Sequence, residues 1–279
     1  MTYIDLSTWQ RIKGFQAPGA RTKFWFLRPN SKQRYLFKMP HKDTGEAWAE
    51  QIAANLLRLL DFPTFQCEFA QFEGRIGVLL ESFREDDEEF FEGVDLLNHH
   101  VEGFDTHSLY GYEFDIIIEV LQPLQLDSEF ARIMVFDAFI GNQDRHCQNW
   151  GILGSNGTYR MAPPYDNGSS LGQLLTEQKI NQMMRDTMMF KGFINRGYSI
   201  VGLAGKKKPK YHLILEHVKQ QYPKEIEETI NRLDALEETS IIRIIDAIPD
   251  EVMSSLHKEF VNKLIQYRKN WLLEWHRKE

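Results

Sequence analysis

The sequence predicts an α+β protein with two lobes, and three observations lead to this prediction. Strand-like runs rich in aromatic and branched residues fill the N-terminal third, helical periodicity dominates the rest, and an acidic run at 85–89 marks the change. The chain has 279 residues, of which 42% are hydrophobic, so it can bury a substantial core. We therefore predict a small β-rich N-terminal lobe, residues 1–84, and a larger, mostly helical C-terminal lobe, residues 85–279.

Composition and charge narrow the class of protein. The net charge of −7 argues against nucleic acid as a direct partner, because binding to phosphates requires clustered lysine and arginine. Cys67 and Cys147 stand alone, without the spacing of a metal site or a disulfide framework, which favours a reducing compartment. The sequence shows neither a secretory leader nor an apolar run of the ~18–20 residues that a membrane span needs. We expect a cytoplasmic protein without a membrane partner.

The N-terminal lobe opens with a glycine-bearing loop, residues 14–23, followed by two strand-like runs at 24–28 and 34–39. The turn at 29–31 predicts that these two runs form a hairpin. Backbone N–H groups of a loop in this position can cover phosphates, which makes Gly19 a candidate for nucleotide binding. An ordinary turn is the alternative interpretation.

Lys38 ends the second strand of this hairpin and precedes a predicted helix at 47–60. Glu46 and Glu50 lie one turn apart near the start of that helix and share a face. A strand lysine paired with a helix glutamate is one way in which phosphoryl-transfer enzymes hold nucleotide phosphates. Solvated surface residues are the alternative for all three side chains.

The remaining elements follow from periodicity and turn signals. Two further strands are predicted at 65–72 and 76–83, and the acidic run after them is predicted to be a solvated loop. A strand hairpin is predicted around the Asn156-Gly157 turn. The basic loop at 205–210 is either solvated or an anion site. Helices are expected at 112–121, 127–140 with a cap from 127–129, 211–222, 224–236 and 251–279.

Residues 141–149 form the densest polar stretch of the chain and follow an apolar helical run. Asp144 and Asn149 are five residues apart, and Asp166 follows after a short predicted hairpin. One carboxylate that orients a hydroxyl, with an Asn and an Asp that hold magnesium through oxygen, is the minimum of a phosphoryl-transfer site. Capping or turn-forming Asp and Asn residues are the alternative.

His146 and Cys147 lie inside the same stretch and allow several interpretations. His146 could be a base, a metal ligand or a structural residue, and the lack of a second histidine at metal spacing favours a structural brace. Cys147 could act as a nucleophile only with a nearby base and a lowered pKa, so we favour a structural thiol.

Residues 141–149 and 161–166 together resemble the catalytic core of HipA-like serine/threonine kinases. That family has the pattern Asn-x-Asp-x-His-x-x-Asn followed by Leu-Ala-Pro-x-Tyr-Asp. Every fixed position of the first string is present here, and Met161 replaces the leucine of the second. The resemblance extends more weakly to residues 20–23, Lys38, the helix with Glu50 and the loop at 205–210.

The resemblance implies a two-lobed, protein-kinase-like fold with ATP and Mg²⁺ as cofactors. It implies that Asp144 is the catalytic base and that Asn149 and Asp166 are the magnesium ligands. It places Lys38 on the phosphates, with Glu50 rather than Glu46 as the favoured partner. The other expected nucleotide-binding residues are Glu81 and Phe83 through their backbone, Gly19 and His146.

The activity implied is transfer of the γ-phosphoryl group of ATP to Ser or Thr of a protein. Kinases of this family often act as toxins that a partner antitoxin restrains, so the resemblance implies an antitoxin as a second protein partner. The chain resembles a compact form without the family's extra N-terminal subdomain, and its glycine loop offers only Thr22 where the family has a regulatory serine. A non-catalytic kinase-fold binding module and a lipid or small-molecule kinase are the alternatives.

Overall fold

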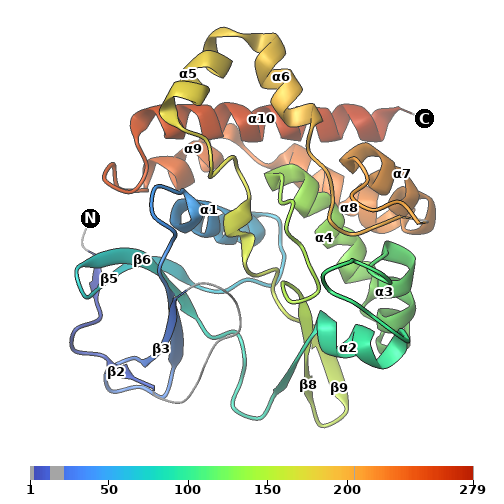
Figure 1. Cartoon of the computed structure of the whole chain (residues 1–279), viewed down its shortest axis with the longest axis horizontal. Helices are drawn as coiled ribbons and strands as arrows, with labels where there is room; N and C mark the ends of the chain where they lie inside the picture. Colours follow the sequence, from blue (N-terminus) through green and yellow to red (C-terminus); the bar gives the residue numbers. More distant parts are fainter. Residues whose placement is uncertain (1–2, 13–21, 204, 279) are drawn as a thin grey trace.

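The computed structural model describes residues 3–12, 22–203 and 205–278, and its N-terminal part is built on a curved sheet (Figure 1). The strands in order across the sheet are β1 (Ile4–Asp5), β5 (Cys67–Phe72), β6 (Arg75–Glu81), β4 (Arg34–Lys38), β3 (Lys23–Leu27) and β2 (Gln10–Arg11). All neighbours are antiparallel except β1 and β5. The predicted hairpin and the next two strands are confirmed.

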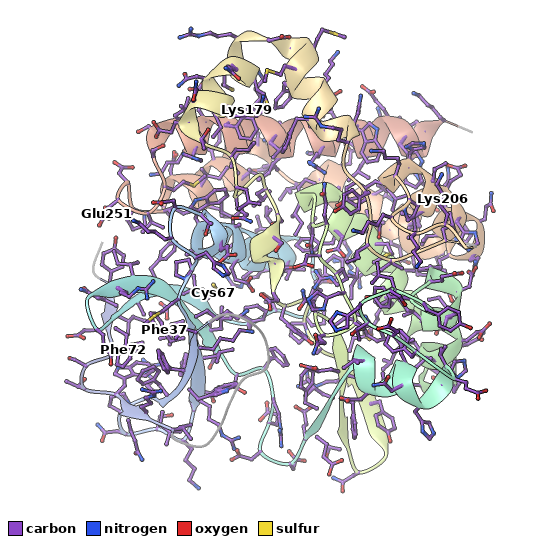
Figure 2. All side chains as sticks on the ribbon, in the orientation of Figure 1. Phe37, Cys67, Phe72, Lys179, Lys206 and Glu251 are labelled. Atoms are coloured by element: carbon purple, nitrogen blue, oxygen red, sulfur yellow. The ribbon has the colours of Figure 1, made fainter. Side chains whose placement is uncertain are left out.

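The two faces of this sheet bury different side chains. Side chains alternate between faces along a strand, so Tyr35 and Phe37 of β4 enter a small outer core with Phe26 and Leu79. Phe37 packs edge-on against Phe72 within that core (Figure 2). The alternation therefore directs Leu36 and Lys38 to the opposite face.

The predicted helix at 47–60 is confirmed as α1 (Glu46–Leu59), and the structure places it against that opposite face, in contact with β5 and β6 (Figure 1). Its apolar residues recur at helical spacing, and Ala49, Ile52, Ala53 and Leu56 are fully buried. Glu50 is also buried on this helix. A carboxylate in such a position requires a cation or hydrogen-bond donors close by.

The C-terminal part is mostly helical and is arranged around α4. The helices are α2 (Gly93–His100), α3 (Phe114–Leu121), α4 (Asp127–Ile140), α5 (Glu177–Arg185), α6 (Thr187–Asn195), α7 (Tyr211–Gln221), α8 (Pro223–Ala235), α9 (Glu238–Asp246) and α10 (Ser255–Arg277). The 3₁₀ turns η1 (Gln122–Leu124) and η2 (Asn167–Ser169) accompany them. All residues of α4 from Ile133 to Ile140 are buried, so this helix is a fixed base for the polar loop that follows it.

The C-terminal part also contains a second sheet, with the strand order β7 (Glu89–Glu92), β8 (Gly151–Ser155) and β9 (Thr158–Met161). The hairpin of β8 and β9 was predicted, and β7 was not. The predicted boundary at residue 84 falls in the connection between β6 and β7. In the described ranges, no helix combines the length and the apolarity needed to cross a membrane.

The α+β class is confirmed, and three local predictions need correction. Leu126 is the N-cap of α4, and no side chain caps it; the Asp127 carboxylate instead accepts a hydrogen bond from Tyr222 at 2.8 Å. Glu88, predicted to be solvated, is buried because Arg160 binds its carboxylate at 2.6 Å. The last helix begins at Ser255 because the Ser254 hydroxyl caps it.

Candidate active site

The polar loop begins where α4 ends, at Gly141. Gly141 has a φ of 70°, and a Cβ there would lie 2.5 Å from the Arg268 guanidinium carbon, so only glycine can end the helix here. The next residue, Asn142, is buried and donates to Asp137 Oδ1 at 3.1 Å. Its own Oδ1 accepts from the Asp144 N–H at 3.0 Å. These contacts fix the backbone from which the Asp144 side chain projects.

Asn149 closes the loop that Asp144 opens. The Asn149 Nδ2 group donates to the Asp144 carbonyl oxygen at 2.7 Å, and the Asn149 side chain is buried. Because the NH₂ group is used in this way, the amide oxygen Oδ1 is the group left for a ligand. The spacing of five residues thus places a carboxylate and an amide oxygen on one closed loop.

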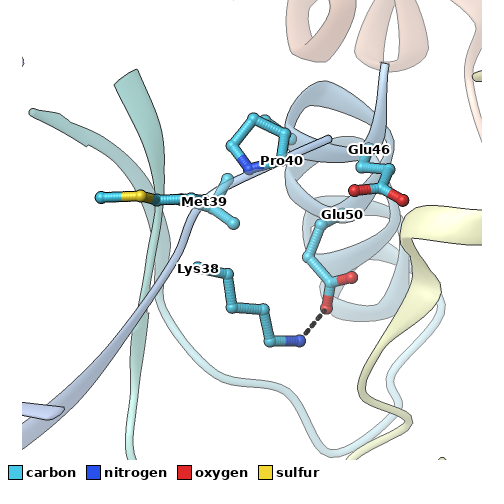
Figure 3. Close-up of a pocket in the computed structure, with 7 residues that line it drawn as sticks. Lys38, Met39, Pro40, Glu46 and Glu50 are labelled. Atoms are coloured by element: carbon cyan, nitrogen blue, oxygen red, sulfur yellow. Dashed lines mark ion pairs between the residues drawn. The ribbon is translucent and has the colours of Figure 1, made fainter. Parts of the chain in front are cut away.

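Asp166 comes to the same place from the other end of the β8–β9 hairpin. It lies in the left-handed region with a φ of 57°, and its N–H donates to Glu50 Oε1 at 3.1 Å. Its Oδ1 lies 3.2 Å from Lys38 Nζ, and Lys38 Nζ lies 3.8 Å from Glu50 Oε1 (Figure 3). The predicted Lys38 and Glu50 therefore meet Asp166. Glu46, on the same small pocket wall, binds His41 Nδ1 at 3.1 Å.

Lys23 is a residue of this cluster that the sequence reasoning missed. Its Nζ lies 3.7 Å from Asp166 Oδ2, on the other side of that carboxylate from Lys38. Lys23 and Lys38 are direct partners in the β3–β4 register and so share a face of the sheet. Two like charges in such positions repel, and Asp166 offsets this repulsion. The register of the predicted hairpin was the signal that could have identified Lys23.

Arg145 was also missed, and it lies beneath the loop rather than in the cleft. Its side chain is 1% exposed and forms a bidentate pair with Asp137 at 2.8 and 3.0 Å. It also donates to the carbonyl oxygens of Asn149 and Tyr165, both at 2.7 Å. Burial alone would lower the pKa of Arg145, but Asp137 beside it raises the pKa overall, so the guanidinium stays charged. One buried cation thus holds the backbone at or next to both predicted metal ligands.

The linker after β6 has some backbone groups that are hydrogen-bonded and two that, within the described residues and outside the strand ladders, are not. Ser82 is bonded on both sides, its N–H to Arg34 O at 2.9 Å and its carbonyl to Gln33 Nε2 at 3.2 Å. Phe83 O accepts from Arg160 at 2.9 Å. In the described part of the chain, no hydrogen bond outside the strand ladders uses the Glu81 carbonyl or the Phe83 N–H. These are an acceptor and a donor of the kind that adenine requires, and their role stays a prediction.

The surroundings of His146 favour the neutral form of its ring. The Gln148 N–H donates to His146 Nδ1 at 3.2 Å, which assigns the ring proton to Nε2. Burial lowers the pKa of His146, against the opposing influence of Asp144 and Asp166. A neutral imidazole with one N–H donor near the two carboxylates is compatible with either a brace or a nucleotide contact.

Three other sequence candidates lie outside this constellation. Burial raises the pKa of Cys147 to about 11, so its thiol stays protonated and the structural interpretation holds. Gly19 lies outside the described residues. In the basic loop, Lys207 and Lys210 donate to the carbonyls of Ser108 at 2.5 Å and Arg196 at 2.9 Å, which makes them structural ties rather than an anion site.

Comparisons with known proteins show what this chain is similar to. The sequence model of the HipA-like C-terminal domain matches residues 15–239. The serine/threonine-protein kinase CtkA of Helicobacter pylori is 26% identical over 263 residues, which cover 88% of this chain and 78% of CtkA. The crystal structure of the H. pylori proinflammatory kinase CtkA has a TM-score of 0.85 at 23% identity, covering 99% of this chain and 97% of that one. HipA of Shewanella oneidensis, in a complex with HipB and operator DNA, has a TM-score of 0.61 at 14% identity, covering 95% and 67%. The predicted two-lobed HipA-like fold is confirmed.

Proposed function

The chain belongs to the family of HipA-like C-terminal domains, and from this premise we propose that it is an ATP- and magnesium-dependent protein kinase. It transfers the γ-phosphoryl group to a Ser or Thr hydroxyl of a protein. The observation that carries the proposal is the convergence of three separate segments: the loop with Asp144 and Asn149, the turn that follows Asp166 and contacts Asp144, and the strand whose Lys38 contacts Asp166. The family match and the kinase CtkA as a relative support it.

The donor set suits magnesium. Asp166 supplies a carboxylate and Asn149 an amide oxygen, which are hard oxygen ligands, and no cysteine takes part. In the described residues, no three His, Cys, Asp or Glu side chains gather into a metal site. Magnesium would be held by Asp166, Asn149 and the phosphates of the nucleotide itself. When bound, it neutralises the charge that develops on the phosphate oxygens.

The chain's own residues do the remaining work by positioning and by charge. The Asp144 carboxylate accepts the proton of the attacking hydroxyl and orients its oxygen toward the γ-phosphorus. The Lys38 ammonium, held by Glu50, exchanges its contact with Asp166 for a contact with phosphate oxygens. Lys23 lies on the opposite side of Asp166 and can do the same. The bond between the γ-phosphorus and the bridging oxygen breaks, and ADP leaves with the electron pair.

The adenine end of the nucleotide is assigned to the linker. Glu81 O and Phe83 N–H offer one acceptor and one donor, and Gln33 Nε2 binds the carbonyl of Ser82, which belongs to the same peptide unit as the Phe83 N–H. Phe83 also stacks on Tyr165, with ring centroids 5.6 Å apart and planes at 27°. The stack connects the linker to the residue before Asp166.

A phosphotransfer assay tests the proposal. The purified full chain is incubated with γ-labelled ATP and magnesium, with dephosphorylated casein or a cell lysate as the acceptor, and phosphoamino acids are identified after hydrolysis. We expect label on phosphoserine or phosphothreonine that disappears in Asp144→Ala. Label found only in lipid or small molecules would indicate a lipid or small-molecule kinase. ATP binding without any phosphoryl transfer would favour a non-catalytic module.

The biological setting is proposed from the family. The Shewanella HipA structure contains the partner HipB, so an antitoxin-like protein that restrains this kinase is an expected partner here. Both cysteines are free and buried, which agrees with work in the reducing cytoplasm. Co-purification of the tagged chain with the product of a neighbouring gene tests the partner.

A further inference from the structure

The Asp144 carboxylate has a hydrogen-bond partner that neither the sequence motifs nor the proposed mechanism includes. The Ser169 hydroxyl donates to Asp144 Oδ2 at 3.2 Å, across 25 residues of chain. In the described part of the chain, Asp144 Oδ1 makes no hydrogen bond. One oxygen of the proposed base is thus held, and the other is left for an acceptor hydroxyl.

Both ends of this contact are fixed by buried groups. Ser169 ends the 3₁₀ turn η2, which packs against α1. Asn167 of the same turn is fully buried, donates to Pro164 O at 2.8 Å and accepts from Arg145 at 2.6 Å. Two residues beyond Ser169, the Leu171 N–H binds the carbonyl of Ile140 at the end of α4 at 3.0 Å. A serine on so constrained a turn has little freedom to move away from the base.

Building on the proposed function, we propose that Ser169 is a positioning residue for the catalytic base. It holds Asp144 Oδ2 so that Oδ1 faces the incoming hydroxyl. Because Asp166 begins the same turn, one short segment sets both a metal ligand and the orientation of the base.

The position of Ser169 also resembles that of an acceptor, since it is hydrogen-bonded to the base. Autophosphorylation at this serine would be a different role, in which the hydroxyl leaves the carboxylate once phosphorylated. The immobile turn favours the positioning role, because an acceptor must approach the γ-phosphorus in line with the leaving oxygen. The experiment below separates the two.

Three variants of the full chain test the inference: Ser169→Ala, Ser169→Thr and Ser170→Ala. Ser170 is the matched control, since it is a neighbouring buried serine whose hydroxyl has no hydrogen-bond partner in the described residues. We expect Ser169→Ala to lower kcat by about tenfold to a hundredfold, with the KM for ATP within about twofold of wild type. Ser169→Thr, which keeps the hydroxyl, restores most of kcat, and Ser170→Ala behaves as wild type.

Each other outcome has a defined meaning. A wild-type kcat in a folded Ser169→Ala protein overturns the inference and leaves the proposed function intact. A rise in the KM for ATP with an unchanged kcat overturns it also, as it indicates a nucleotide contact. Stoichiometric phosphate on Ser169 in the wild-type protein, located by mass spectrometry, assigns the acceptor role instead. If neither the wild-type chain nor Asp144→Ala transfers phosphate, the proposed function is contradicted, and this inference is contradicted with it.

Discussion

The loop at 141–149 and the lysines of the large sheet are held in place in different ways. On the side of the catalytic loop, Arg145 joins Asp137, Asn149 and Tyr165 through four bonds of 2.7–3.0 Å, and the group is sealed from solvent. On the side of the large sheet, Lys23 and Lys38 are held at Asp166 by charge at 3.2–3.7 Å. The catalytic loop is therefore fixed before any ligand arrives.

The lysine contacts, in contrast, can be exchanged. A lysine is a point charge on a flexible stem, and an incoming phosphate can take the place of the Asp166 carboxylate. Arg145 cannot be exchanged in this way because its partners are backbone carbonyls and a buried carboxylate. On the proposed function, the buried side sets the geometry of the site and the charged side responds to the nucleotide. The following predictions test that division, from the largest expected effect to the smallest.

The largest effect on activity is expected from Asp166→Asn, which keeps the shape of the side chain and removes its charge. Phosphoryl transfer should fall by at least about a hundredfold, because Asp166 is both the proposed metal ligand and the partner of both lysines, and the substitution removes its charge. Initial rates at saturating ATP and magnesium measure this, with far-UV circular dichroism to verify the fold. A variant with more than about a tenth of wild-type activity would show that Asp166 is not a metal ligand.

Arg145→Met should affect stability as well as activity. It leaves the Asp137 carboxylate buried without its cation, which costs about 3–5 kcal/mol in free energy of unfolding. Urea unfolding of this variant is compared with Arg185→Met, in which the lost arginine is exposed at the end of α5. Equal free energies of unfolding in the two variants would contradict the stabilising role of Arg145.

Lys38→Ala and Lys23→Ala test the charged side of the cleft. Lys38 is held by Glu50 as well as Asp166, so its loss should raise the KM for ATP by about tenfold, and the loss of Lys23 by less. Lys42→Ala, at an exposed position in the connection after β4, is the control. A larger effect from Lys23 than from Lys38 would reverse the assignment of the principal phosphate contact.

The smallest effect concerns pH and His146. The folded pKa of His146 lies below the unfolded value of about 6.5, so the folded state binds fewer protons than the unfolded one. Stability is therefore complete above about pH 6.5 and falls as pH drops below that value toward the folded pKa. Burial also lowers the pKa of His276, which therefore adds to the loss of stability at acid pH. Urea unfolding at about pH 7.5 and about pH 5.5 should show a smaller acid loss in His146→Gln than in wild type.

Much of this site could be predicted from the sequence, because its parts belong to short strings. Asp144 and Asn149 lie five residues apart on one loop, and the Asn156-Gly157 turn brings Asp166 back beside them. Lys38 and Glu50 come from a strand end and a helix start, where periodicity alone sets which way the side chains point.

The residues that were missed depend on contacts between distant segments. Lys23 could be identified only from the register of the β3–β4 pair. Ser169 could be identified only from the contact of η2 with Asp144. Arg145 was passed over because arginine is normally exposed, and nothing in the sequence indicates that Asp137 lies buried beside it. Strand β7 was missed because it is short and its first residue, Glu89, belongs to the acidic run that was predicted to be a loop; pairing with β8 decides its structure.

The most direct test of the account separates nucleotide binding from phosphoryl transfer in Asp144→Asn. Calorimetry gives the affinity for ATP and magnesium, and a single-turnover experiment with γ-labelled ATP and casein gives the rate of transfer. The account predicts affinity within about twofold of wild type and transfer slower by about a hundredfold or more, since Asp144 acts on the acceptor hydroxyl. Transfer at the wild-type rate would contradict the central claim that Asp144 is the catalytic base of a kinase.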